Sequence, residues 1–207
     1  MTLRYEDVLA DLRAAYDGSA GNRDGMVKQR FKLDERAVFL DRLQVVRASS
    51  LLEVGAGTGQ DSVYFRDNGL RVVAVDLSPE MVRRCREKGI DARVGDVRRL
   101  DFPSESFDAV YAMNCLLHVP DADLPEVLRE IRRVLRPGGL CYVGLWGGSP
   151  GEGVHPADHH EPKRFFAIRS DEQVYAAVRE LFDLVEFHTL EDEEHHFQSV
   201  TLVRPVD

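Results

Sequence analysis

The sequence predicts an α/β protein, a three-layer sandwich whose central sheet has seven strands, mostly parallel, with the last strand antiparallel. From Leu51 onward, short apolar segments alternate with longer amphipathic ones, which is the pattern of repeated strand–helix units. The first apolar segment ends in a glycine-rich turn, at the place where open α/β sheets bind ligands. The last two expected strands are close in sequence, so a tight connection can make them antiparallel neighbours.

The first half of this region has clear element boundaries. "LLEVG" is predicted to be the first strand, and residues 60–68 the helix that follows it. The second strand, "RVVAVDL", leads into a helix that begins at Ser78-Pro79, because serine caps helices and proline suits their first position. "DARVGDV" is a weaker third strand, and "FDAVYAM" is the fourth.

In the second half, residues 123–135 carry apolar side chains at helical spacing, and "PGG" at 137–139 is expected to end that helix. "LCYVGLW" is the fifth strand, and 149–162 is expected to be a loop rich in glycine, proline and histidine. A helix capped by Ser170 then runs to about residue 182. "LVEFHTL" and "HFQSVTLV" are the last two strands.

Two further helices, 4–15 and 33–47, are expected before the first strand. The segment between them, "YDGSAGNRDGM", has three glycines and little to bury, so it is predicted to be a loop. A hinge or flap and a plain surface linker both stay open for it. Residues 1–207 are expected to form one domain, in which 1–47 is a helical lid over a core of 48–207, and closure of the lid would exclude water.

Composition restricts the classes of function. The 27 basic and 36 acidic residues leave a formal charge of −9, which disfavours nucleic acid as a partner, because phosphate binding needs a concentrated basic face. Cys85, Cys115 and Cys141 form no C-x-x-C pair, so neither a disulfide framework nor a zinc ribbon is indicated. The N-terminus lacks a signal peptide's apolar segment, and no apolar run approaches the roughly 20 residues that span a bilayer. A cytoplasmic protein without membrane contact is expected.

The glycine-rich turn, "EVGAGTGQ", brings backbone N–H groups close to a ligand at the start of a helix. The dinucleotide fingerprint G-x-G-x-x-G fits Gly55 and Gly57 but fails at Gln60. The G-K-[ST] of a phosphate-binding loop is also absent. The pattern is instead an acid followed by G-x-G-x-G, from Glu53 to Gly59, so a phosphate is not the expected ligand.

Four features, in this order, resemble the class I S-adenosylmethionine-dependent methyltransferases. They are "EVGAGTG", the acid Asp76 in "VVAVDLS", the segment "GDVRRLDFPSESFDAVYAMN", and the helix, turn and strand of "LREIRRVLRPGGLCYVG". The resemblance covers 51–146 by motif and the rest by the order of strands and helices. It implies a Rossmann-like core, S-adenosyl-L-methionine as the cofactor, and methyl transfer to a small-molecule acceptor by in-line displacement.

The resemblance also implies roles for the residues that match its motifs. Gly55 and Gly57 would pass close to the methionine part of the cofactor, and Glu53 would help to place its amino group. Asp76 would accept hydrogen bonds from both ribose hydroxyls, and Asp96 from the adenine amino group. The expected cofactor-binding residues are Glu53, Gly55, Gly57, Gly59, Asp76, Leu77, Met81, Asp96, Val97, Asn114 and Leu116.

The remaining members of this set would surround the same molecule. The backbone at Val97 would contact the adenine ring, and Leu77 and Met81 would pack on the adenine and ribose. Ordinary core packing is an equal alternative for Met81. Asn114 and Leu116, just beyond the fourth strand, would line the methionine side and the point of transfer.

Methyl transfer needs two aligned reactants, and a base only where the acceptor must lose a proton. His118 follows the fourth strand at its carboxyl end and titrates near neutral pH, so it is the candidate catalytic base, with a role in shaping the pocket as the alternative. Cys115 is expected to pack rather than react. The loop "GVHPADHHEPKRFF" has three histidines and two acids whose spacing matches no metal motif. No metal is expected, and this loop is predicted to line the acceptor pocket.

Two other functions stay open on the sequence. An NAD-dependent oxidoreductase on a related fold is one, although Gln60 and Asp96 argue against it. A catalytically inactive module that binds S-adenosylmethionine is the other. The fourth strand is followed by "NCLL" and not by the Asn/Asp-Pro-Pro-Tyr/Phe of family members acting on planar amide or base nitrogens, which favours a small-molecule acceptor. Oxygen, nitrogen, carbon and sulfur acceptors all stay open, as does the oligomeric state.

Overall fold

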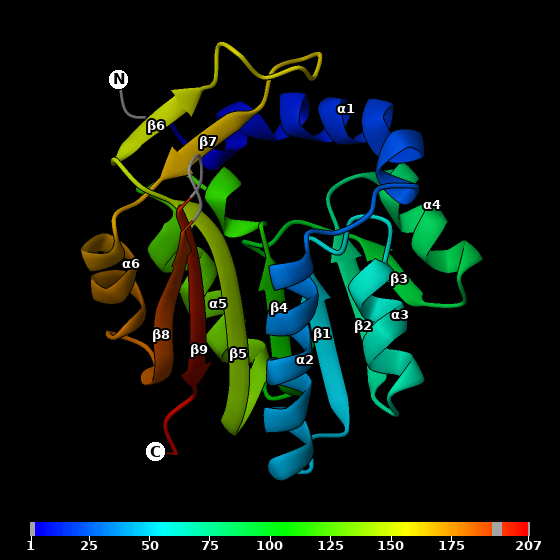
Figure 1. Cartoon of the computed structure of the whole chain (residues 1–207), viewed down its shortest axis with the longest axis vertical. Helices are drawn as coiled ribbons and strands as arrows, with labels where there is room; N and C mark the ends of the chain where they lie inside the picture. The colour runs from blue at the N-terminus through cyan, green and yellow to red at the C-terminus, as the bar shows by residue number, and fades with distance from the viewer. Residues whose placement is uncertain (1–2, 192–195, 207) are drawn as a thin grey trace.

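The structure is a computed structural model and describes residues 3–191 and 196–206. A seven-stranded sheet runs through the middle of the molecule in the order β3-β2-β1-β4-β5-β9-β8 (Figure 1). The strands from β3 to β5 are parallel neighbours, whereas β9 is antiparallel to both β5 and β8. The predicted α/β sandwich with a reversed last strand is therefore confirmed. The strands are β1 (Ser50–Val54), β2 (Arg71–Asp76), β3 (Asp91–Val94), β4 (Phe107–Met113), β5 (Leu135–Gly147), β8 (Asp183–Glu191) and β9 (His196–Val203).

Helices cover both faces of the sheet, because its parallel strands are apolar on both sides. They are α1 (Tyr5–Asp24), α2 (Arg30–Val45), α3 (Gln60–Asp67), α4 (Pro79–Glu87), α5 (Leu124–Val134) and α6 (Asp171–Val178). On one face, Phe39 of α2 and Phe65 of α3 pack against Tyr111 of β4. α5 and α6 contribute to the larger apolar core on the other face. α1 crosses the edge at which the parallel strands end (Figure 1).

The predicted loop at 16–26 is wrong, because α1 continues through this segment to Asp24. Each glycine in a helix costs about 1 kcal/mol relative to alanine, and contacts with α4 offset that cost. The Asp17 carboxylate accepts hydrogen bonds from the Ser78 hydroxyl at 2.5 Å and from the Glu80 backbone N–H at 3.1 Å. Ala20 is fully buried. The length of α1 is thus set by docking onto α4, which local sequence does not reveal.

The prediction that "PGG" ends a helix is also wrong. α5 ends at Val134, and the turn lies inside β5, where the register with β4 shifts between Phe107 and Ala109. The backbone N–H of Gly138 donates to the carbonyl of Arg204, and the N–H of Arg204 donates to the carbonyl of residue 139. This pairing with the chain that follows β9 keeps the turn within the sheet.

The expected loop 149–162 contains a strand. β6 (Gly151–Val154) pairs antiparallel with β7 (Phe165–Ile168) as a separate two-stranded sheet. With two glycines in four residues, β6 has no apolar alternation that a sequence pattern could detect. β7 packs beside the short 3₁₀ helix Leu116–His118, which follows β4. This contact brings the loop before β7 to the carboxyl end of the sheet.

Candidate functional site

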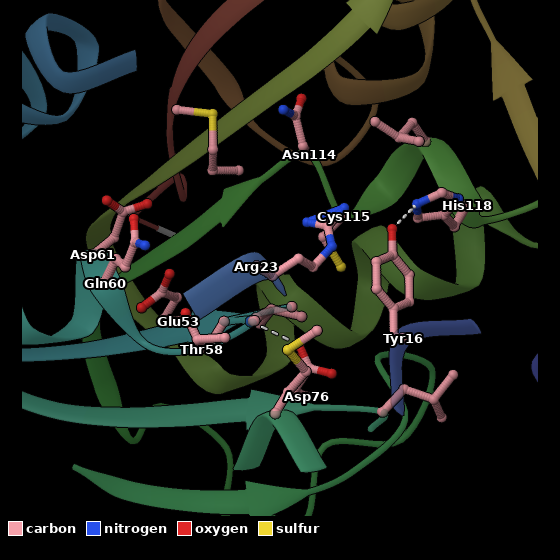
Figure 2. A pocket seen from close by; sticks show the side chains of 18 of the residues that line it. Tyr16, Arg23, Glu53, Thr58, Gln60, Asp61, Asp76, Asn114, Cys115 and His118 are labelled. Carbon is pink, nitrogen blue, oxygen red and sulfur yellow. Dashed lines mark hydrogen bonds between the residues drawn. The ribbon is translucent and has the colours of Figure 1, made fainter. Parts of the chain in front are cut away.

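A cavity of about 430 Å³ lies at the carboxyl ends of the parallel strands, beneath α1. Its walls come from the glycine turn after β1, the ends of β2 and β4, the 3₁₀ helix, α1 with the connection that follows it, and β7. Figure 2 shows the side chains that surround it. Open α/β sheets bind their ligands at this edge, and the volume suits a ligand of nucleoside size.

The glycine turn brings backbone, not side chains, to the wall of the cavity. Gly55 has a φ of +69°, and a Cβ there would lie 2.5 Å from Cys115 Sγ, so no larger residue fits. Gly57 has a φ of +55°, and a Cβ there would meet nothing within 4 Å. The backbone at 55–57 therefore forms a cradle that faces open space.

Glu53 lies one residue before the end of β1, and its buried carboxyl is at the floor of the cavity. The Ser62 hydroxyl donates a hydrogen bond to Oε2 of Glu53. Burial, together with the negative charge of nearby Asp61, raises the pKa of Glu53 to about 8. A cationic group bound next to Glu53 would favour its ionised form and so gain a strong interaction.

Asp76 ends β2 and faces the glycine turn. Its Oδ2 accepts from the Gly57 N–H at 2.8 Å, and its Oδ1 accepts from the Ser78 N–H at 2.9 Å. Burial raises the pKa of Asp76 to about 6, although these two hydrogen bonds lower it. A carboxylate has about four lone-pair sites, so Asp76 keeps capacity for donors on a ligand.

Asn114 follows β4 in a strained backbone conformation, with a φ of +52°. Its backbone N–H donates to the carbonyl of Gly144 at 2.8 Å. Its side-chain Oδ1 is buried and has no hydrogen-bond partner among residues 3–191 and 196–206. Because Asn114 lines the cavity, this oxygen can accept a hydrogen bond from a donor on a bound ligand.

Most of the expected cofactor-binding residues line the cavity. Those that do are Glu53, Gly55, Gly57, Asp76, Leu77, Met81, Val97 and Asn114. The other three lie beside it. Gly59 caps α3 next to Cys85, the Asp96 carboxylate accepts from the Arg98 backbone N–H at 2.8 Å, and Leu116 is buried in the apolar core. The roles assigned to the whole set stay predictions.

His118 lines the cavity with both ring nitrogens engaged. Its Nδ1 lies 2.7 Å from the carbonyl oxygen of Phe165, which can only accept, so Nδ1 carries the proton. The Tyr16 hydroxyl therefore donates to Nε2, at 2.5 Å (Figure 2). Burial lowers the pKa of His118 to about 3, so the ring is neutral at physiological pH. The nitrogen that a direct base would use is occupied by Tyr16.

Tyr16 reaches this position from α1. Arg164 Nη1 donates to its hydroxyl oxygen at 3.1 Å. Burial raises the pKa of Tyr16, although Arg164 lowers it, so the phenol is protonated at neutral pH. The hydroxyl thus donates to His118 and accepts from Arg164, which leaves one lone pair for a ligand.

The histidine loop is organised around Arg164. Asp158, His159 and His160 bring three possible metal-ligand atoms within 4.8 Å of one another. However, Arg164 donates to both oxygens of Asp158, at 2.9 and 2.8 Å. The positively charged guanidinium therefore occupies the carboxylate oxygens that a metal ion would need as ligands. This loop is predicted to line the acceptor pocket. Of its residues, Arg164 and Phe166 line the cavity, and the histidines do not.

Positive side chains reach the cavity from α1 and the segment after it. Lys28 binds the Asp61 carboxylate. The Arg23 guanidinium lies over the Tyr16 ring, 4.9 Å from its centre, and Lys32 lines the same cavity from α2. Within the described ranges, neither Arg23 nor Lys32 has a carboxylate within 4.0 Å.

Sequence reasoning missed the residues that α1 contributes, because it ended that helix at residue 15. A signal was nevertheless present. Tyr5, Leu12, Tyr16 and Arg23 all line the cavity, and their spacings of seven, four and seven residues place them on one helical face. Extending the helical pattern across the glycines would have found Tyr16 and Arg23.

The segment that forms much of this site matches a known family of protein domains. A family profile described as "Methyltransferase domain" matches residues 52–143, which contain the glycine turn, Asp76 and Asn114. Over these residues the chain resembles the S-adenosylmethionine-dependent methyltransferases.

The curated relatives that the chain matches are longer than the chain itself. It is 34% identical over 112 residues to Methyltransferase GfsG of Streptomyces halstedii, across 50% of this chain and 40% of that protein. It is 32% identical over 139 residues to the malonyl-[acyl-carrier protein] O-methyltransferase of Serratia marcescens, across 66% of this chain and 53% of that protein. The matched part thus spans about half the length of these relatives or less.

The fold of this chain is also similar to a solved structure along its whole length. The 1,6-didemethyltoxoflavin-N1-methyltransferase of Burkholderia thailandensis matches with a TM-score of 0.79 and 23% identity, over 100% of this chain and 92% of that one. That protein was crystallised with 1,6-didemethyltoxoflavin and S-adenosylhomocysteine. At this identity the likeness concerns the fold. A search of the described residues found no helix with the length and apolar character needed to cross a bilayer.

Proposed function

We propose that this chain binds S-adenosyl-L-methionine in the cavity and transfers its methyl group to a small-molecule acceptor. The observation that carries the proposal is the convergence of the glycine cradle with three hydrogen-bond acceptors, Glu53, Asp76 and Asn114, on one cavity. Such a set suits a ligand that presents several donors. The S-adenosylhomocysteine bound in the toxoflavin methyltransferase of similar fold supports this choice.

The residues present fit this cofactor chemically. Asp76 would accept from the ribose hydroxyls, through lone pairs that its backbone donors leave available. Glu53 and Asn114 would take the amino group, which brings a positive charge to the buried carboxyl and a donor to the unpaired amide oxygen. Leu77 and Met81 offer apolar surface to the adenosine. The bound cofactor would supply a methyl group activated by a sulfonium.

Tyr16 is the residue that we propose touches the acceptor. An acceptor hydroxyl or amine can donate to the lone pair that His118 and Arg164 leave on the Tyr16 oxygen, and this hydrogen bond would fix where the attacking atom lies. His118 then acts through Tyr16, as a positioning residue. Its neutral Nε2 holds the phenolic proton away from the acceptor.

The segment 1–47 is proposed to be the lid of a single domain. Its connection between α1 and α2 is fastened to the helix after the glycine turn. The Gln60 side-chain amide donates to the backbone carbonyls of Asp24 and Met26, at 3.3 and 3.2 Å, and Lys28 binds Asp61. With these contacts α1 lies over the cavity, where as a lid it would keep water from the reacting atoms.

Parallel calorimetric titrations with S-adenosylmethionine, S-adenosylhomocysteine and NAD test the cofactor. Binding of the first two without NAD is expected, and binding of NAD alone would overturn the proposal. Turnover is tested with radiolabelled S-adenosylmethionine and a panel that includes a malonyl thioester and 1,6-didemethyltoxoflavin, the acceptors suggested by the similar proteins. Label transfer to at least one acceptor is expected. Cofactor binding with no transfer across a broad panel would instead support an inactive binding module.

A further inference from the structure

We propose that Arg23 and Lys32 form an anion site inside the cavity, which takes a carboxylate or phosphate group. This inference rests on the proposed function, because it assigns another part of the same cavity. Two sources can supply the anionic group. One is the carboxylate of the cofactor's methionine part, and the other is an anionic group on the acceptor.

Arg23 forms no ion pair with a carboxylate among residues 3–191 and 196–206. Its Nε is buried and has no hydrogen-bond partner in the described part of the chain. Its guanidinium lies over the Tyr16 ring and within the cavity, and Figure 2 shows it between the Tyr16 side and the side of Glu53 and Asp76. A buried donor without an acceptor costs free energy, which a bound oxyanion would recover.

Lys32 faces the same cavity from α2. Its Nζ lies 4.5 Å from the centre of the Trp146 ring and 5.6 Å from that of Phe31, so aromatic faces replace part of its hydration. Burial, followed by the positive charges of Lys28 and Arg23, lowers the pKa of Lys32 to about 8. Like charges in one cavity destabilise one another, and a bound oxyanion would offset this repulsion.

The acids that line the cavity form no ion pair with Arg23 or Lys32 among the described residues. Asp61 is paired with two other basic side chains, and Asp76 accepts from two backbone N–H groups. Glu53 has a raised pKa of about 8, so its carboxyl is mostly protonated at neutral pH. Among the described residues, Arg23 and Lys32 are therefore left without an ion pair of their own.

Arg23 and Lys32 lie toward different parts of the cavity. The charge of Arg23 lowers the pKa of Asp76, which places it toward the expected ribose. Lys32 lies on Trp146 near the end of β5, on the side of the cavity away from β2. The site can thus lie between cofactor and acceptor, and the two sources are separated by the choice of probes.

The test is calorimetry on Arg23→Gln and Lys32→Gln, with Arg30→Gln as the matched control. Arg30 lies on the same helix as Lys32, is exposed, and pairs with Asp34 outside the cavity. The first arm compares S-adenosylhomocysteine with S-adenosyl-3-thiopropylamine, which lacks only the carboxylate. The second arm titrates phenyl phosphate, and benzyl alcohol as its neutral reference, into protein saturated with S-adenosylhomocysteine. Circular dichroism and melting temperature verify that each variant is folded.

A loss of about ten- to hundredfold in affinity for an anionic probe, without loss for its neutral partner, is expected from at least one variant. If a variant loses affinity for S-adenosylhomocysteine but not for S-adenosyl-3-thiopropylamine, the site binds the cofactor's carboxylate. If a variant loses affinity for phenyl phosphate but not for benzyl alcohol, the site binds an anionic group on the acceptor. The proposal is overturned if both cavity variants match Arg30→Gln, if anionic and neutral probes lose affinity equally, or if the wild type prefers neither anionic probe.

Failure of the proposed function gives a different result. Wild-type protein that does not bind S-adenosylhomocysteine would contradict the cofactor assignment. Phenyl phosphate titrated into the protein without S-adenosylhomocysteine would still test the anion site, because Arg23 and Lys32 face the cavity in the protein alone.

Discussion

The hydroxyl of Tyr16 and Nε2 of His118 are 2.5 Å apart, although the two residues are separated by 102 positions in the sequence. The Phe165 carbonyl fixes the direction of this hydrogen bond, because it requires the proton of His118 to sit on Nδ1. The N-terminal helix therefore does more than cover the cavity. It places a phenol beside the ring that follows β4, and the phenol rather than the imidazole presents a free lone pair.

Tyr16→Phe should separate methyl transfer from cofactor binding. Loss of the hydroxyl removes a group proposed to orient the acceptor, so we expect kcat/KM to fall about ten- to hundredfold. Affinity for S-adenosylhomocysteine should stay unchanged. The matched control is Tyr64→Phe, because Tyr64 is an aromatic residue outside the cavity lining. A parallel fall in cofactor affinity in calorimetry would assign Tyr16 to the cofactor instead.

His118 should stay neutral throughout the pH range in which enzymes of this kind are assayed. Burial lowers its pKa to about 3, so protonation of the folded protein requires strongly acidic conditions. Nitrogen-detected or long-range ¹⁵N NMR should show a neutral ring protonated at Nδ1, without titration between about pH 5 and pH 8. A midpoint near 6.5 would show that the ring of His118 is not buried in solution as it is in the structure.

Elements defined by their neighbours in sequence were predictable here, and those defined by distant contacts were not. Ser78 caps α4 by accepting from the Met81 N–H, as the Ser-Pro pair indicates. The continuation of α1 depends instead on Asp17, whose partners lie more than 60 positions away. The role of His118 depends on a carbonyl 47 positions later, in a strand too short to predict.

The same distinction applies to the cavity. The glycine turn and Asp76 are recognisable because one strand and its turn set their geometry. Arg23 and Lys32 are recognisable as cations in the sequence, but the way α1 and α2 pack decides that no described carboxylate pairs with them. Sequence alone therefore predicted more of the cavity lining around the glycine turn than on the side of α1.

Asp76→Asn should weaken cofactor binding, because an amide cannot accept on both side-chain atoms. We expect the affinity for S-adenosylhomocysteine to fall about ten- to hundredfold. The pKa of about 6 also predicts a pH dependence in the wild type, since a protonated Asp76 accepts fewer hydrogen bonds. Wild-type affinity should fall as the pH drops below about 6, and that dependence should vanish in Asp76→Asn. Unchanged affinity in a folded variant would show that the ribose lies elsewhere.

Glu53→Gln should stabilise the protein without ligand at alkaline pH. The pKa of Glu53 is raised from 4.5 to about 8 by burial and by Asp61, so its contribution is fully present below 4.5 and is lost as the pH rises through about 8. Glutamine keeps the shape and cannot ionise. Its melting temperature should exceed that of the wild type by several degrees at about pH 8.5, and the two should converge at acidic pH. Glu126→Gln, at an exposed position of α5, is the control. Equal pH profiles for Glu53→Gln and wild type would contradict the raised pKa.

Asp17→Ala should loosen the lid, because the Asp17 carboxylate is what fastens α1 to the start of α4. Removing a charged acceptor from two donors should cost about 1–3 kcal/mol of stability. Hydrogen exchange should become faster in α1 than in α5, because the lost contacts hold the lid and not the core. Asp11→Ala on the exposed face of the same helix removes equal charge and should change neither quantity. If exchange rises uniformly across the sheet as well, α1 unfolds only together with the core, and the lid has no independent motion to close the cavity.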